Sequence, residues 1–326
     1  MRTFIAKIPL PIAGVALALT ALGNLLAPAS ETVHLACGFA ALALIALLGA
    51  KAVLFPGLIR NDLRSSIMAS VSAAAFMTLM QLASYLAPVA FWPAYALWVA
   101  AIVAHLMLMM WFTGHFIARF KLSEVFPTYF ICYVGIVVAS ATSPAFGMQA
   151  VGHMIFWFGL ACYAVLLVVV TLRYARHQVP EGARPLFCIY TAPMSLSLVG
   201  YLATAATPNL VFVAVLLGLA QALFAVVLFR LPSLLRLKFY PSYAAMTFPF
   251  VITATALGQA LALFRGAGVA LPAAFDVLFF AEAALATVMV TYVLAHYVRF
   301  LAQRPAPAVP AAAPASAAAL PERREA

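Results

Sequence analysis

Long apolar stretches recur along the chain from Pro9 almost to Phe300, separated by short groups of charged residues and by Pro/Gly turns. Each stretch is long enough for a helix that crosses the hydrocarbon core, which takes about 20 residues. Breaking the sequence at the charges and turns predicts ten helices, at 8–27, 33–54, 64–86, 93–118, 125–143, 147–174, 184–205, 209–230, 241–264 and 271–300. The pattern therefore indicates an all-α membrane protein with ten transmembrane helices.

The end of the chain differs in composition from the rest. From Gln303 onward the sequence is rich in Ala and Pro and closes with charged residues (ERREA). Such a segment lacks the apolar side chains that build a packed core. We expect one transmembrane domain over residues 1–302, followed by a disordered cytoplasmic tail over residues 303–326.

The overall composition supports a lipid environment. Hydrophobic residues make up 67% of the chain, charged residues 8%, and the mean hydropathy is +1.10. A soluble domain of 326 residues needs far more polar surface to cover its core. We therefore expect membrane lipids to surround most of the molecule.

The basic residues predict the orientation in the membrane. The ten-helix arrangement places 17 of the 18 Lys and Arg residues on one side, at the N-terminus, after the even-numbered helices and in the tail, with Arg265 alone on the other. Lys and Arg are enriched on the cytoplasmic side of membrane spans. Both termini are therefore expected in the cytoplasm of a bacterium, with the protein in the inner membrane. The net charge of +10 is explained by this bias and requires no nucleic acid as a partner.

A repeat is visible in the same arrangement. The odd-numbered helices begin near residues 8, 64, 125, 184 and 241, so the chain reads as five helical hairpins in series. Hydroxyl side chains and prolines concentrate in the odd-numbered helices, from the third to the ninth for the hydroxyls. Hydroxyls in hydrocarbon are best placed at helix interfaces or beside a water-filled lumen. This predicts an inner ring of five odd helices around a central pore; the alternative is that these small residues only allow close helix packing.

Four segments resemble a known family. They are KIPLPIAGVALAL, FPTYFICYVGIVVASATSP, APMSLSLVGYL and YAAMTFPFVITATALGQAL, at the starts of the first and fifth helices and in the seventh and ninth. They are similar to the TehA tellurite-resistance and slow-type (SLAC-type) anion channel family, also described as C4-dicarboxylate or malic acid transporters (TDT). The resemblance covers about residues 7–300, and its most specific element is Thr247-Phe248-Pro249.

The resemblance implies a homotrimer of independent pores, each formed by five kinked inner helices and backed by five outer ones. In that family a phenylalanine on the ninth helix closes the pore, and the matching residue is Phe248. The first helix has fewer glycines than the family pattern, so no site is carried over to it.

Prolines mark the predicted bends of the pore helices. Pro249 has no N–H, so the Ala245 carbonyl loses its helical partner and the bend can push Phe248 toward the axis. Pro193 frees the Ile189 carbonyl in the same way. The hydroxyls expected to line the pore are those of Thr247, Thr191, Ser195, Ser140 and Ser72.

Two ionisable residues lie well inside predicted spans, His105 near the middle of the fourth and Glu282 inside the tenth. Such residues are rare in membranes and often functional. Two readings remain open: a structural pair, formed within the chain or with a neighbouring subunit, or a proton relay if both face the lumen.

We predict a channel or channel-like exporter for small inorganic or organic anions, gated by Phe248. The alternative is a secondary transporter for C4-dicarboxylates such as malate, or an efflux protein for tellurite or other toxic compounds. That alternative needs a cation to hold carboxylates, and no Lys or Arg falls within the middle of an odd helix. No catalytic motif, metal-ligand cluster or nucleotide-binding loop is recognisable, so we expect no enzyme, no metal and no cofactor.

Overall fold

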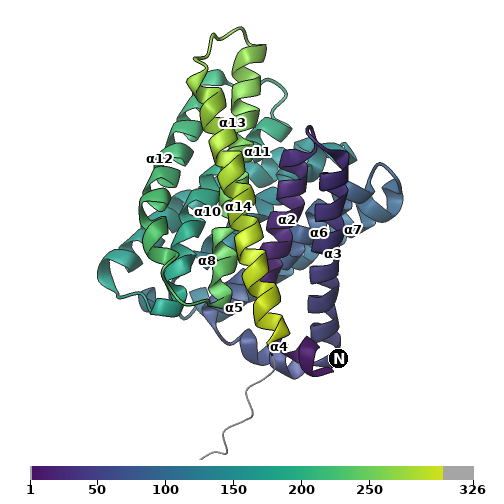
Figure 1. The fold of residues 1–326 in the computed structure, drawn as a ribbon, viewed down its shortest axis with the longest axis vertical. Coiled ribbons are helices and arrows are strands. Elements are labelled where there is room, and N and C mark those ends of the chain that lie inside the picture. Colours follow the sequence, from purple (N-terminus) through teal and green to yellow (C-terminus); the bar gives the residue numbers. More distant parts are fainter. Residues whose placement is uncertain (1, 304–326) are drawn as a thin grey trace, which may run out of the picture.

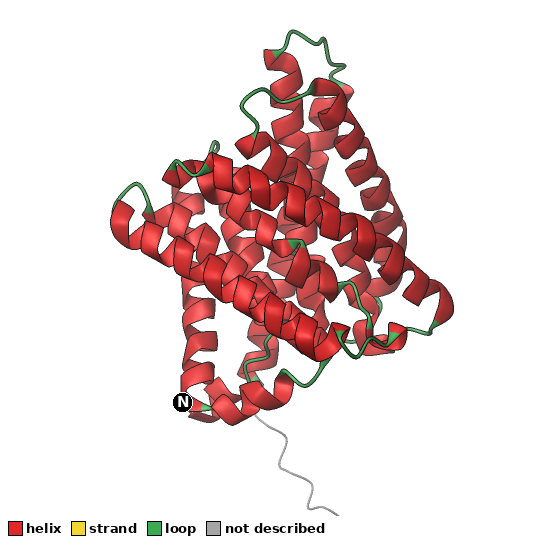
Figure 2. Ribbon diagram, turned by 180° about the vertical axis from the view of Figure 1, so that it is seen from behind, coloured by secondary structure: helices red, strands yellow, loops and turns green. Residues whose placement is uncertain are grey.

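The computed structural model describes residues 2–303, and all regular structure in this range is helical (Figure 2). The predicted tail lies outside the described residues, apart from Gln303. The chain is therefore a helical protein, as the hydropathy pattern predicts.

Five helices are long and largely unbroken, and they match the predicted even-numbered helices. They are α3 (Glu31–Leu54), α7 (Phe91–Phe112), α10 (Gln149–Arg176), α12 (Leu210–Leu234) and α14 (Ala274–Ala302). The helix α7 continues into a π-helical turn, η1 (Thr113–Ile117). Two short helices that the hydropathy pattern did not predict lie in the connections, α4 (Pro56–Asp62) and η2 (Leu122–Glu124).

Four of the five predicted odd-numbered helices are instead divided into shorter pieces, and the first is preceded by a separate short helix; we call these the five divided segments. The first contains α1 (Arg2–Ala6), which lies before the predicted helix 8–27, and α2 (Ile12–Leu26), and the second contains α5 (Ser66–Val71) and α6 (Ala73–Leu86). The third contains α8 (Thr128–Tyr133), η3 (Gly135–Val137), α9 (Val138–Thr142) and η4 (Ser143–Phe146). The fourth contains η5 (Glu181–Thr191) and α11 (Ala192–Thr204), and the fifth contains η6 (Pro241–Met246) and α13 (Phe248–Gly266).

Among the described residues, eight helices are long and apolar enough to cross a membrane. Two shorter apolar helices, Ile12–Leu26 and Gly135–Phe146, coincide with the first and fifth predicted spans. The chain is thus a multi-pass membrane protein by length and composition of its helices.

The divided segments pack against one another in a closed order. The helix α2 contacts α6, α6 contacts α9, α9 contacts α11, α11 contacts α13, and α13 returns to α2. The long helices cover this group from outside, with α12 and α3 on opposite flanks (Figure 1). Burial follows the same division, since 83% of the most apolar stretch of Glu181–Thr204 is buried against 17% for Glu31–Leu54. The divided segments are therefore the interior of the molecule.

Two basic residues predicted in connections are in fact buried at helix ends. Lys51, in the last turn of α3, donates to the Ile8 carbonyl at 2.7 Å and pairs with Asp62 at 3.1 Å. The guanidinium of Arg173, in the last turn of α10, lies over the Phe126 ring at 4.2 Å. The helix α3 ends at Leu54 as predicted and α10 continues two residues past its predicted end, and both side chains fold back onto the protein.

Candidate functional site

A cavity of about 390 Å³ lies in the middle of the five divided segments. Every segment contributes to its wall, and none of the lining residues belongs to the long helices α3, α7, α10, α12 or α14. The five divided segments, which contact one another in a ring, therefore enclose this cavity. This cavity is the candidate functional site.

The cavity extends from one face of the molecule to about half its depth. Its wall begins at Ser65, Pro180 and Tyr240, which lie in the connections that carry the basic residues. It ends at the level of Met77 and Phe248. Ser65 and Met77 are twelve residues apart, about 18 Å of helix, against a hydrocarbon core of about 30 Å.

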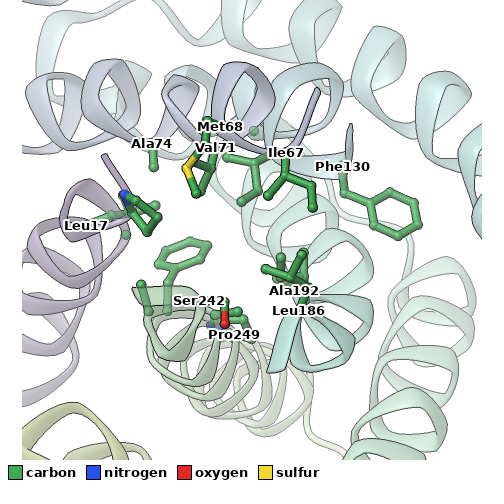
Figure 3. A pocket seen from close by; sticks show the side chains of 18 of the residues that line it. Leu17, Ile67, Met68, Val71, Ala74, Phe130, Leu186, Ala192, Ser242 and Pro249 are labelled. Atoms are coloured by element: carbon green, nitrogen blue, oxygen red, sulfur yellow. The ribbon is translucent and has the colours of Figure 1, made fainter. Parts of the chain in front are cut away.

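The wall is almost entirely apolar. Residues from separate elements line one shared space, among them Leu17, Val71, Phe130 and Leu186, and the Val71 and Leu186 side chains point into it (Figure 3). No Asp, Glu, Lys, Arg or His is among the lining residues. The sequence pattern missed these apolar side chains because nothing separates them from core residues until the segments are assembled.

Phe248 is the first residue of α13 and lines the deep end of the cavity. The preceding Thr247 has φ −117° and ψ −84°, which is outside the helical region and divides η6 from α13. Pro249 sits in the first turn of α13, where a missing N–H costs nothing. The predicted interruption is present, with its non-helical residue at Thr247.

At the second predicted bend, before Pro193, the hydrogen bonding differs from the prediction. Pro193 lies in the first turn of α11, but the Ile189 carbonyl is not left without a partner. It accepts from the Ala192 N–H because η5 is a 3-10 helix, whose bonds join residues three apart. The Ser195 hydroxyl bonds the Thr191 carbonyl instead, at 2.9 Å.

The five hydroxyls predicted to line the pore lie outside the cavity wall. Thr191 and Ser195 meet Thr253 of α13 at 2.9 and 3.1 Å, and Ser140 donates to the Gly152 carbonyl at 2.7 Å. Ser72 and Thr247 donate to the carbonyls of Ala69 and Ala244. These bonds satisfy the hydroxyls inside helices and at helix contacts, so the arrangement follows the close-packing alternative; a role in ion passage stays a prediction.

His105 and Glu282 are buried but do not pair with each other within the chain. The His105 Nε2 bonds the Cys132 carbonyl at 2.8 Å, behind the cavity wall at Gly135. Glu282 of α14 faces Gln221 of α12, and within residues 2–303 its two buried carboxylate oxygens have no hydrogen-bond partner. Neither residue lines the cavity, because each stands on an outer helix.

Hydrogen bonds join η5 to the start of η6 at the mouth of the cavity. The Tyr240 hydroxyl donates to Glu181 at 2.8 Å, and the Ser242 hydroxyl donates to the Gly182 carbonyl at 2.6 Å. A hydrogen bond with the Tyr240 side chain also raises the pKa of the neighbouring Lys238 above its ordinary value. The mouth therefore combines the nearby basic residues Arg184 and Lys238, which we call the basic rim, with two hydrogen bonds between the fourth and fifth segments.

A comparison with protein families identifies the family of this chain. The model described as voltage-dependent anion channel (SLAC1) matches residues 6–298, nearly the whole described chain. No curated protein matches the chain.

Proposed function

The chain belongs to the voltage-dependent anion channel family, and from this premise we propose that it passes small anions through a pore between the five divided segments, with Phe248 as the gate. The family resemblance inferred from the sequence is thus confirmed. Family membership places the protein among anion channels and transporters.

The observation that carries the proposal is the position of Phe248 in the cavity. The cavity reaches this side chain from the basic face, and none of its lining residues lies beyond Leu17, Met77, Leu196 or Pro249 in the divided segments that contain them. Only 6% of Phe248 is exposed, so the ring is packed against its neighbours at the deep end of the cavity. An apolar constriction of this kind blocks ions by excluding water.

The charge distribution favours passage over tight binding. A wall without charged side chains offers an anion no strong binding site, while the basic rim raises the anion concentration at the mouth. An ion that binds weakly also leaves easily, which conduction requires. Chloride, nitrate and small organic acids are the permeants that this geometry suits.

The proposal includes the finer arrangement expected from the sequence. It takes all ten predicted helices as transmembrane, counting the two short apolar helices as interrupted spans. It further takes both termini as cytoplasmic in a bacterial inner membrane, and the assembly as a homotrimer with one pore in each subunit.

Anion flux into proteoliposomes tests the gate. Phe248→Ala should raise chloride and nitrate flux several-fold, because truncation removes most of the ring that narrows the path. Phe250→Ala is the matched control: its ring is fully buried against Phe224 and lies outside the cavity wall. Unchanged flux through correctly folded Phe248→Ala would refute the gate, and an equal rise in Phe250→Ala would show a general loosening.

The same vesicles separate a channel from the coupled carriers. Fast malate or chloride flux without a change of internal pH supports a channel. Slow malate flux accompanied by proton movement, and insensitive to Phe248→Ala, would instead support the C4-dicarboxylate transporter.

A further inference from the structure

A second cleft, of about 460 Å³, lies on the outer surface of the molecule and is separate from the central cavity. The end of α3, the short helix α4 and the last turns of α7 with η1 form its wall. Arg60, Arg64, Trp111 and His115 are its polar and aromatic lining residues, beside Ile59 and Leu63. The proposed anion pathway uses none of them.

The cleft carries positive charge that no acidic residue neutralises. Arg60 and Arg64 are both exposed, and neither forms an ion pair within residues 2–303. Asp62, the acidic residue between them in sequence, is held by Lys51 at 3.1 Å. Two guanidinium groups are therefore free to bind an anion, and their planar donors suit phosphate oxygens.

An aromatic pair forms the opposite wall. The rings of Trp111 and His115 are stacked, with centroids 5.3 Å apart and planes 11° from parallel. The π-helical turn Thr113–Ile117 holds His115 here, closed by the Ala118 N–H bonding the Thr113 carbonyl at 3.0 Å. Trp side chains are enriched at the level of the lipid headgroups in membrane proteins.

Exposed apolar side chains continue from the cleft along both helices. Val53 of α3 is 80% exposed and Met110 of α7 is 67% exposed, and Met107 lies one turn further along α7. In a membrane protein such side chains contact acyl chains. An anion in the cleft would therefore have an apolar surface directly beside it.

We propose that this cleft binds the phosphate headgroup of an anionic membrane lipid, with Arg60 and Arg64 holding the phosphate and the Trp111–His115 pair packing against the headgroup. The combination of free guanidiniums, an interfacial aromatic pair and adjoining lipid-facing helices favours a lipid over a soluble phosphate. The proposal needs only that the chain spans a membrane, so it stands whether or not Phe248 gates a pore.

Lipid binding can be measured on the full chain in nanodiscs. Phosphatidylglycerol in a phosphatidylcholine background should raise the thermal unfolding temperature of the wild type, and native mass spectrometry should detect the retained lipid. Arg60→Gln/Arg64→Gln should lose the stabilisation and bind the lipid roughly thirtyfold more weakly. Each lost basic contact to an anionic headgroup lowers the affinity, and the two losses multiply. Arg176→Gln/Arg236→Gln removes the same charge from exposed positions outside the cleft and should keep both responses.

Each variant is compared between neutral and anionic lipid, so a change in its baseline stability does not affect the result. If the double variant does not fold, Arg64→Gln alone is used, since Arg64 is exposed and outside α4. An equal loss in the control pair would overturn the proposal. So would stabilisation by inorganic phosphate in phosphatidylcholine alone, or a smaller oligomer of Arg60→Gln/Arg64→Gln in neutral lipid, which would show that a second copy covers the cleft.

Discussion

At the scale of single residues, one valine fixes how the inner elements η3 and α11 and the outer helix α10 approach each other. Val137 of η3 packs between two glycines, Gly159 of α10 and Gly200 of α11. A Cβ at Gly159 would lie 2.1 Å from Val137 Cγ2, and a Cβ at Gly200 would lie 2.5 Å from Val137 Cγ1. Small residues at helix interfaces allow such close contact in membranes.

We expect Gly159→Ala to destabilise the protein by about 1–3 kcal/mol, because the added methyl overlaps a side chain that cannot move away. Thermal unfolding in detergent measures the effect. Val137→Ala should partly restore stability in the Gly159→Ala background, as expected for residues in direct contact. Gly218→Ala is the control, since a Cβ there meets nothing within 4 Å; equal losses at both glycines would refute the packing argument.

At the scale of the elements, the molecule separates long outer helices from divided inner segments. The third divided segment shows how a break is stabilised: α8 ends at Tyr133, η3 begins at Gly135, and the Cys132 carbonyl accepts from His105 Nε2. A backbone carbonyl released by a helix break inside a membrane needs such a partner. His105 therefore acts on the cavity wall indirectly, by holding the break next to Gly135.

His105→Phe should lower stability by about 1–3 kcal/mol, because the Cys132 carbonyl becomes a buried acceptor without its donor. His105→Gln keeps an N–H donor and should recover part of the loss. The readout is the unfolding temperature of the two variants under identical detergent conditions. A Gln variant as unstable as the Phe variant would mean that the ring shape, and not the hydrogen bond, supports the break.

At the scale of the whole molecule, the distribution of basic residues indicates to which side of the membrane the cavity opens. Its mouth lies among the connections that carry most of the Lys and Arg residues. The basic residue on the opposite side, Arg265, pairs with Asp276 at 2.5 Å. If the positive side is cytoplasmic, the cavity faces the cytoplasm and Phe248 separates it from the outside.

Cysteine labelling tests this orientation. In a chain whose four native cysteines are replaced, Ala270→Cys should react with a membrane-impermeant maleimide in intact cells, because the proposed topology places the loop after α13 outside. Ser123→Cys, in the connection before α8, should react only after permeabilisation. Both positions are exposed, so accessibility alone does not separate them. Labelling of both from the same side would contradict the ten-span topology.

The sequence determined the features that depend on local composition. Apolar runs and charge placement predicted where the helices lie, since a span in lipid must satisfy its backbone internally and keep its charges outside. Pro249 likewise located the interruption before Phe248, because a missing N–H acts on the chain that carries it.

Only the tertiary structure decided which side chains share a space. The hydroxyls that composition assigned to a pore wall bond within helices and at helix contacts, while Leu17, Val71 and Leu186 line the cavity. His105 and Glu282, both predicted within spans, face different partners because α7 and α14 cover different parts of the inner group. Such outcomes depend on the rotation of each helix about its axis. Contacts between segments far apart in sequence set that rotation, and hydropathy does not record them.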